Sequence, residues 1–259
     1  MRFKATILGC GPSGGVPCPG LGWGDCDPSN PKNYRLRSSL LIETPETTLL
    51  IDTSPDLRQQ LLTHDVKKID AVLYTHGHAD HTDGINDLRH FAFLRGAPIP
   101  IYAAPPVLSE LKKRFSHIFD GFKKEPDLYP PFLQGNILPI SSFRIRDIVG
   151  RAMEQDHYTC SSLGFRFGDL AYSTDVCRFP EETLQALAGI KTWIVECGDP
   201  YETPSHSSLQ SVLRWVEHIC PKRAILVHMK HTMDYATLCR ILPQGIEPAY
   251  DGLSVEGSM

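Results

Sequence analysis

The run His76-Gly77-His78-Ala79-Asp80-His81 constrains this chain more than any other feature of its sequence. It follows Ile69 to Tyr74, an apolar and partly β-branched segment that predicts a strand. Side chains two positions apart in extended chain point to the same side, so His76 and His78 can share one metal ion. Asp80 and His81 follow where the chain turns toward a helix, and they can face a neighbouring ion. Imidazole nitrogen and carboxylate oxygen suit zinc, manganese or iron. Three imidazoles repel one another once protonated, so a solvent-facing loop has no reason to gather them.

Three further polar residues stand at or near the ends of apolar strands. His157 lies in a short loop before Leu163 to Phe167, Asp175 follows Leu170 to Ser173, and His228 terminates Ala224 to Val227. A rigid sheet can hold ligands at such positions. Each residue alone would be read as an ordinary loop residue that faces solvent. Together with the histidine run, they are predicted to complete a metal site.

The order of elements favours a layered α/β sandwich with two central sheets and helices outside. Residues 120–135 are predicted to be an irregular loop, and Ser207 with Gln210 resembles a capping box for the helix that follows. We expect one domain over residues 1–259, because 41% apolar and 22% charged residues are typical of a chain with a substantial core. The predicted strands are Ser39–Glu43, Thr48–Asp52, Ile69–Tyr74, Ile99–Ala103, Thr192–Glu196 and Ala224–Val227, and the main helices are Asp56–His64, Pro106–Phe115, Pro180–Leu187, Ser207–Ile219 and Tyr235–Leu242.

Charge and cysteine content narrow the class of protein. The formal net charge is −4, with no segment rich in Lys and Arg, which argues against a non-specific grip on nucleic acid. No apolar run approaches membrane-spanning length, and the first residues lack the apolar core of a signal peptide. Eight scattered cysteines without an export signal predict reduced thiols. We therefore expect a cytoplasmic protein without a membrane partner.

The segment Thr75 to His81 resembles the signature of the metallo-β-lactamase superfamily, and His157, Asp175 and His228 match its remaining ligand positions in order. The resemblance implies a four-layer αββα sandwich and two divalent ions, zinc or manganese. It also implies that Asp175 bridges the two ions. True class B β-lactamases are a poorer match, because they lack this bridging aspartate and the histidine after the aspartate of the run. By the same resemblance, one ion is bound by His76, His78 and His157, and the other by Asp80, His81 and His228.

Three features resemble the PhnP-type cyclic phosphodiesterases: the glycine-rich segment Leu8 to Pro17, His206 before a helix, and His231 three residues after His228. This resemblance implies hydrolysis of a small phosphodiester, such as a phosphoribosyl cyclic phosphate or a nucleotide, by a metal-bound hydroxide. The partner expected is that small molecule, with no stable nucleic-acid partner and with a homodimer left open. His206 and Asp80 are the predicted catalytic residues, with His206 as a proton donor or an oxyanion contact.

Several alternatives stay open at this stage. A glyoxalase-type thioesterase would share all seven ligands, and a non-hydrolytic PqqB-like binding protein also begins with glycine-rich turns. Ribonuclease Z fits less well, because no insertion rich in glycine and lysine is present to clamp transfer RNA. Asp52 either supports a metal ligand from behind or caps the helix after Pro55. Arg35, Arg37, Arg178 and Lys230 either meet a substrate phosphate or are ordinary solvated charges.

PhnP-type proteins hold a structural zinc through three closely spaced cysteines and the histidine equivalent to His231. The corresponding region here offers only Cys18 and Cys26, with Cys10 further back. A closed structural zinc site needs four ligands. These residues therefore either share a metal with a further ligand or are packed thiols beside a histidine.

Overall fold

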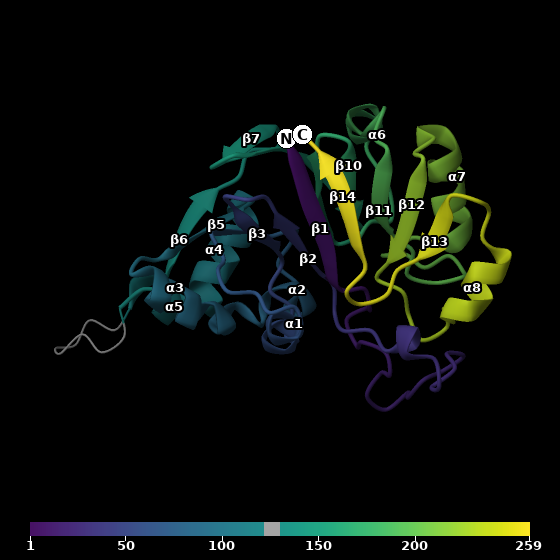
Figure 1. The fold of residues 1–259 in the computed structure, drawn as a ribbon, viewed down its shortest axis with the longest axis horizontal. Helices are drawn as coiled ribbons and strands as arrows, with labels where there is room; N and C mark the ends of the chain where they lie inside the picture. The colour runs from purple at the N-terminus through teal and green to yellow at the C-terminus, as the bar shows by residue number, and fades with distance from the viewer. Residues whose placement is uncertain (122–129) are drawn as a thin grey trace.

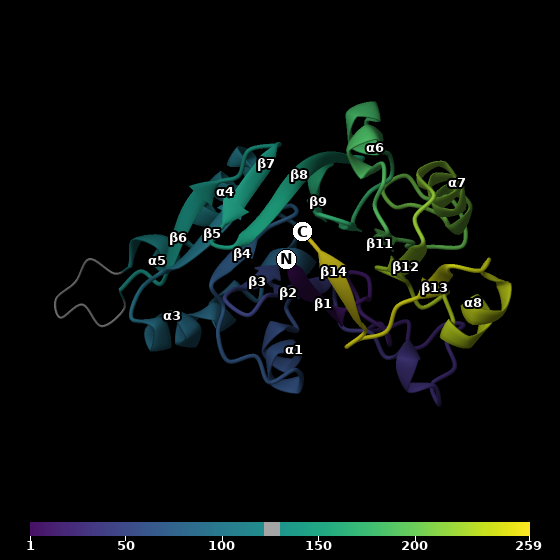
Figure 2. The same cartoon turned by 45° about the horizontal axis from the view of Figure 1, so that its top comes forward.

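The computed structural model describes residues 1–121 and 130–259. Two seven-stranded mixed sheets pack face to face and carry helices on their outer sides (Figures 1 and 2). The predicted four-layer αββα sandwich is therefore confirmed. β1 and β14 pair antiparallel, and this pairing brings the two chain ends together, with the Met1 amino group 2.6 Å from the Met259 carbonyl oxygen. No described helix has the length and apolar character needed to cross a bilayer.

The first sheet has, in spatial order, β14 (Ser254–Ser258), β1 (Arg2–Gly9), β2 (Ser39–Glu43), β3 (Thr48–Ile51), β4 (Ala71–Leu73), β5 (Ile99–Ala103) and β6 (Leu133–Ile137). The second has β13 (Ile246–Pro248), β12 (Arg223–Val227), β11 (Thr192–Glu196), β10 (Leu170–Ser173), β9 (Cys160–Phe167), β8 (Ile148–His157) and β7 (Ser142–Ile145). The described α-helices are α1 (Leu57–Thr63), α2 (Ala79–Thr82), α3 (Arg89–Arg95), α4 (Pro105–Arg114), α5 (Ser116–Asp120), α6 (Glu181–Leu187), α7 (Leu209–Ile219) and α8 (Tyr235–Ile241), with 3₁₀ turns at Pro31–Asn33 and Ile85–Leu88.

Strands of the first sheet are buried on both faces. In β2, Leu40 and Ile42 point into the core between the sheets, whereas Leu41 packs in the outer core under the helices. Leu50 of β3 likewise faces outward, between two residues that face inward. Because successive side chains in a strand alternate between faces, a strand buried on both sides reads as a continuous apolar run. This explains why the sequences SLLIE and TLLI form central strands.

Each sheet is antiparallel on one side and parallel on the other. β3 to β6 pair in parallel in the first sheet, and β10 to β13 do so in the second. The carboxyl ends of parallel strands meet at one edge, where loops of an α/β fold commonly bind ligands. Polar residues follow β3, β4, β10 and β12 at these edges, and they form the site described below.

Two local predictions were wrong. Residues 120–135 were predicted to be irregular, but residues 133–135 belong to β6, which pairs in parallel with β5 from Ile99↔Leu133 onward. The two prolines before β6 obscured the strand, and Gly135 permits close packing, since a Cβ there would lie 2.7 Å from Leu108 Cδ1. Residues 122–129 of the same predicted loop lie outside the described residues.

The second wrong prediction is the capping box at Ser207. Helix α7 starts at Leu209, and its N-cap is Ser208, whose hydroxyl accepts from the Ser211 amide at 3.2 Å. Ser207 instead donates its hydroxyl to the Glu196 carbonyl oxygen at 2.9 Å. Because Ser207 is hydrogen-bonded to the end of β11, α7 begins two residues later than predicted.

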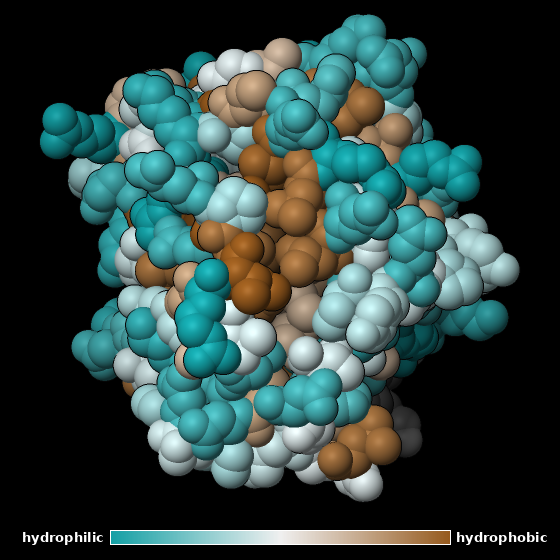
Figure 3. Space-filling model, turned by 90° about the vertical axis from the view of Figure 1, so that its right-hand side faces the viewer, coloured by the Kyte–Doolittle hydropathy of each residue, from teal (hydrophilic) through white to brown (hydrophobic). Residues whose placement is uncertain are grey.

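The outer side of the second sheet is covered by α6, α7 and α8, but not completely. Trp215, Val216, Leu242 and Ile246 are only partly buried where they pack on the core. Figure 3 shows apolar side chains gathered in a hollow on the face that carries α7 and α8.

Candidate metal centre

Seven side chains predicted as metal ligands converge at the strand ends. His76 and His78 follow β4, His157 is the last residue of β8 rather than part of a loop, and Asp175 and His228 follow β10 and β12. Their donor atoms form two groups, within each of which all atoms lie within 4.8 Å of one another. The groups are His76, His78 and His157 on one side, and Asp80, His81, Asp175 and His228 on the other. This division matches the expected assignment to two ions.

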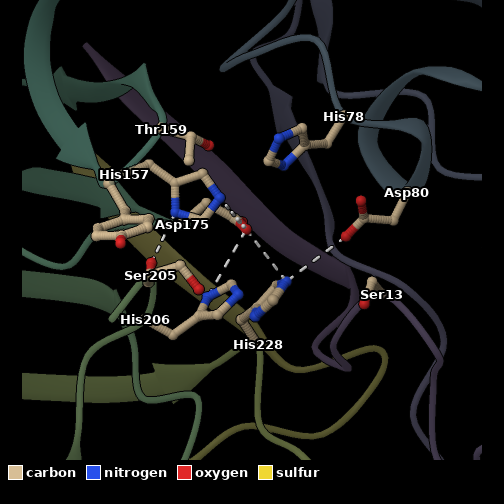
Figure 4. A pocket seen from close by; sticks show the side chains of 10 residues that line it. Ser13, His78, Asp80, His157, Thr159, Asp175, Ser205, His206 and His228 are labelled. Carbon is tan, nitrogen blue, oxygen red and sulfur yellow. Dashed lines mark hydrogen bonds and ion pairs between the residues drawn. The ribbon is translucent and has the colours of Figure 1, made fainter. Parts of the chain in front are cut away.

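Asp175 lies at the centre of the cluster (Figure 4). Its Oδ1 is 3.6 Å from Nε2 of His157 and 3.4 Å from Nε2 of His228, and its Oδ2 is 3.0 Å from Nε2 of His81. Burial alone would raise the pKa of this carboxyl group, but the charges of His228 and His81 outweigh burial and hold the pKa well below its usual range. A carboxylate between both groups of imidazoles can bridge two cations.

The imidazoles are oriented so that their Nε2 atoms face the centre. Nε2 of His76 is buried without a hydrogen-bond partner, and Nε2 of His81 and of His228 is buried facing only the carboxylates of the cluster. The opposite ring nitrogens of His76, His81 and His157 are held by the protein, at Thr75 Oγ1, Asp52 Oδ2 and the Ser205 carbonyl oxygen. A buried polar atom without a partner costs about 1–3 kcal/mol. Divalent cations would satisfy all of these atoms, so the residues present fit a metal centre of nitrogen and oxygen ligands.

Asp52 supports this arrangement from behind. Its carboxylate accepts from the Thr75 amide and hydroxyl, both at 2.8 Å, and its Oδ2 lies 2.7 Å from Nδ1 of His81. The N-cap of α1 is Asp56, so the alternative role of Asp52 as a helix cap is not observed. Burial would raise the pKa of Asp52, and here burial outweighs the opposing effect of His81.

Backbone strain is concentrated at the same edge. Asp52, Asp175 and His228 have φ angles of 63°, 53° and 56°, in the left-handed region that residues other than glycine rarely adopt. Such conformations cost on the order of 1–3 kcal/mol each, and they persist at sites where function requires a particular orientation of the side chain. All three residues leave a parallel strand, and the left-handed turn directs the side chain into the cluster.

His206 lies on the loop between β11 and α7, beside the second group of ligands. Its Nδ1 is hydrogen-bonded to Oε1 of Glu196, and the same oxygen lies 3.4 Å from Nδ1 of His228. Glu196 Oε2 accepts from the Val176 amide at 2.5 Å. Burial would raise the pKa of Glu196, but hydrogen bonds from both histidines lower it. The sequence analysis missed Glu196, although a carboxylate that ends the buried strand Thr192–Glu196 was an available signal.

A cavity of about 280 Å³ opens above the cluster. His206 and His228 border it on one side, and His78 and Asp80 lie opposite (Figure 4). Hydroxyl groups of Ser13, Thr159 and Ser205 also line it, together with Tyr158, His157 and Asp175. The cavity can therefore hold a small polar group in contact with both predicted catalytic residues.

The basic residues considered as phosphate contacts do not line this cavity. Arg35 is 1% exposed and donates to the carbonyl oxygens of Lys230 and Met233. Arg37 is paired with Asp56, and Lys230 lies 3.3 Å from Asp199. Arg178 lies 3.8 Å from Asp156 at the surface. Arg35 thus has a structural role that neither alternative anticipated.

Cys18, Cys26 and His231 form no group of metal ligands among the described residues. The Cys18 thiol donates to the Pro19 carbonyl oxygen at 3.7 Å, and Cys26 is buried beside the Arg35 guanidinium. Gly24 allows His231 to pack closely, since a Cβ at this position would lie 2.2 Å from the imidazole. This geometry favours packed thiols beside a histidine.

The fold and site together define a class of protein: an αββα sandwich with a histidine and aspartate cluster at the strand ends. Residues 47–229 match the beta-lactamase superfamily domain, and the chain belongs to this superfamily. Within the superfamily it is PhnP-like. A crystal structure of a diphosphatase from the PhnP family superposes with a TM-score of 0.92 at 33% identity, covering 99% of this chain and 98% of that chain.

Two other relatives show how far the similarity extends. An octanoyltransferase of Porphyromonas gingivalis is 31% identical over 256 residues, which cover 97% of this chain and 51% of the relative. The chain spans about half the length of the curated relatives it matches. Zn²⁺-bound PqqB from Methylobacterium extorquens shares the fold, with a TM-score of 0.76 at 20% identity over 97% of this chain and 99% of that one. The comparisons support a metal-dependent hydrolase.

Proposed function

We propose that this chain is a metal-dependent phosphodiesterase that hydrolyses a small, cyclic phosphodiester, such as a phosphoribosyl cyclic phosphate or a cyclic nucleotide. The observation that carries the proposal is the pairing of His206 with Glu196 beside two groups of side chains that could hold metal ions. Similarity to a diphosphatase of the PhnP family supports chemistry at phosphorus. We further propose that the protein is cytoplasmic and uses two ions, zinc or manganese.

A pair of divalent ions would supply a hydroxide at neutral pH and neutralise charge on the phosphoryl oxygens. The side chains of the protein perform the remaining tasks. Glu196 accepts from Nδ1 of His206, which leaves Nε2 of His206 to donate a proton to the departing alkoxide. Asp80, opposite His206 across the cavity, orients the reacting groups as well as binding a cation. Hydroxyl groups of Ser13 and Thr159 contact the polar part of the substrate.

Thioester hydrolysis is the second candidate, because a glyoxalase-type thioesterase would use the same seven side chains as metal ligands. A thiolate leaves without a proton donor, since thiols are far more acidic than alcohols, so the His206–Glu196 pair would have no evident use. This physical argument favours the phosphodiesterase. A stable nucleic-acid partner is not proposed, because the net charge is −4.

The test compares cyclic nucleotides, ribose cyclic phosphates and acyl thioesters with the same metal-loaded protein. We expect turnover of the phosphodiesters and loss of nearly all activity in His78→Ala, with metal content reduced and circular dichroism unchanged. His90→Ala, at a helical histidine outside the cluster, is the matched control. Turnover confined to thioesters, or wild-type rates in His78→Ala, would contradict the proposal.

A further inference from the structure

A second cavity, of about 500 Å³, lies beside the metal centre. His78 lines both this cavity and the smaller one above Asp175, and His76 also borders the larger one. Part of a substrate whose phosphorus lies at the metal centre could therefore extend past His78 into the larger cavity. The part of the same substrate that does not enter the larger cavity would bind in the smaller one.

The larger cavity is mainly apolar. Pro105, Pro106 and Val107 at the start of α4 form one wall, Ile140 borders it from the loop between β6 and β7, and Leu163 contributes from β9. The smaller cavity is instead lined by hydroxyl groups, imidazoles and carboxylates. The smaller cavity thus favours polar groups and the larger one apolar groups, and His78 lies between them.

The charges at the larger cavity have one sign. Glu110 and Glu154 line it, and the described residues that line it include no Lys or Arg. Glu110 accepts from Arg114, but that guanidinium also donates to the Gly77 carbonyl oxygen and to Asp83. Gly77 permits this arrangement, since a Cβ there would lie 2.6 Å from Glu110 Oε2. A second anionic group on the substrate would be repelled here, whereas an uncharged apolar group would not.

We infer that the larger cavity binds an uncharged, apolar group that the substrate carries beside its phosphodiester. This inference rests on the proposed function and makes it more specific. Of the substrates proposed above, it favours a cyclic phosphodiester without a second anionic group: the polar hydroxyl groups of the substrate lie among Ser13, Thr159 and Ser205, and its apolar group lies against Val107, Ile140 and Leu163.

Three phosphonates test the inference by direct binding, because each offers the metal centre the same anionic head. Calorimetric titration of the Mn²⁺-loaded full chain is expected to show that phenylphosphonate binds about tenfold more tightly than methylphosphonate, since its ring is buried. 4-Carboxyphenylphosphonate is expected to lose this gain, because its carboxylate faces Glu110 and Glu154.

Two tryptophan variants test whether the tighter binding of phenylphosphonate arises in the larger cavity. Ile140 and Ile137 are 55% and 65% exposed, so both positions tolerate a larger side chain, but only Ile140 lines the cavity. Ile140→Trp is expected to abolish the advantage of phenylphosphonate and to leave methylphosphonate unchanged, while Ile137→Trp leaves both unchanged. Glu110→Gln is expected to improve binding of 4-carboxyphenylphosphonate at least threefold without affecting phenylphosphonate.

The outcomes separate this inference from the proposed function. Equal affinities for phenyl- and methylphosphonate, or equal losses in both tryptophan variants, would overturn the inference even if the wild-type protein hydrolyses bis(p-nitrophenyl) phosphate. Preference for the phenyl group without hydrolysis of any phosphodiester would support the cavity assignment and overturn the proposed function. Failure of all three phosphonates to bind would overturn both.

Discussion

The carboxylate of Glu196 accepts a hydrogen bond from Nδ1 of His206, and this contact fixes which ring nitrogen of His206 faces the cavity. Glu196 is the last residue of β11 and is fully buried, so the surrounding core restricts the movement of its carboxylate. The loop that carries His206 is also tied to β11 through Ser207. A proton donor positioned in this way matters most when the departing group is a poor one.

His206→Ala is therefore expected to slow hydrolysis by about 10²–10⁴-fold for substrates with an alkoxide leaving group, and much less for those with a nitrophenolate. Metal content, measured by mass spectrometry, is expected to stay near that of the wild type. His218→Ala on the exposed side of α7 serves as the control. Equal losses for good and poor leaving groups would show that His206 does not donate the proton.

Asp52→Asn is expected to weaken metal binding by about 10–100-fold, because the carboxylate orients His81 through Nδ1 and increases the basicity of its imidazole. Asparagine tolerates the left-handed backbone that Asp52 adopts, so the substitution tests the hydrogen bond rather than the turn. Competition with a fluorescent chelator measures the affinity.

Asp65→Asn is the matched control for this substitution, because Asp65 also has a left-handed backbone but lies on the surface. The two variants should differ clearly in metal affinity. If they bind metal equally well, Asp52 has no role in supporting the ligand.

The sequence indicated the side chains that converge in the cluster because most of them stand next to a recognisable strand. His76, Asp175 and His228 come at the ends of apolar segments, and their convergence follows from the parallel order of those segments in the two sheets. Glu196 was not predicted, because its role depends on β11 lying beside β12 and on a loop that folds back over the strand end. The local signal, a carboxylate at the end of a predicted strand, does not reveal these tertiary relations.

Arg35 illustrates the same limit. In the sequence it is a cation near a glycine-rich segment, and a phosphate contact was a reasonable hypothesis. In the structure it donates to carbonyl oxygens of Lys230 and Met233, almost two hundred residues away. Strand β6 was missed for a related reason, since pairing with β5 outweighs the effect of the neighbouring prolines on local propensity.

Removal of metal is expected to destabilise the protein, because Nε2 of His76 would remain buried without a hydrogen-bond partner and the clustered imidazoles and carboxylates would lose the cations between them. Dialysis against a chelator should lower the thermal midpoint by several degrees, and Zn²⁺ or Mn²⁺ should restore it, since a ligand that binds only the native state stabilises that state. Differential scanning fluorimetry measures the shift, and Mg²⁺, which prefers oxygen ligands, is the control ion. An unchanged midpoint after verified removal of metal would mean that the cluster is stable without cations.

Asp234 predicts a pH dependence of stability away from the metal centre. It caps α8 by accepting from the Thr237 amide, and it also accepts from the Asn33 side chain, which ties the loop after β1 to the helix.

Burial would raise the pKa of Asp234, but these hydrogen bonds outweigh burial and lower the pKa to about 2. The folded-state value is below that of the unfolded chain, near 3.9, so the ionised group stabilises the fold fully above that pH. This contribution is lost as the pH falls through about 2. Asparagine caps helices about as well as aspartate, but Asp234→Asn removes the charge and leaves only one oxygen to accept from Thr237 and Asn33. The substitution is thus expected to cost about 1 kcal/mol in urea unfolding at pH 7, and clearly less at pH 3. Asp25→Asn, at an exposed carboxylate of the same loop, should change the free energy of unfolding little at either pH. A cost for Asp234→Asn that is the same at both values would show that the charge of Asp234 does not contribute.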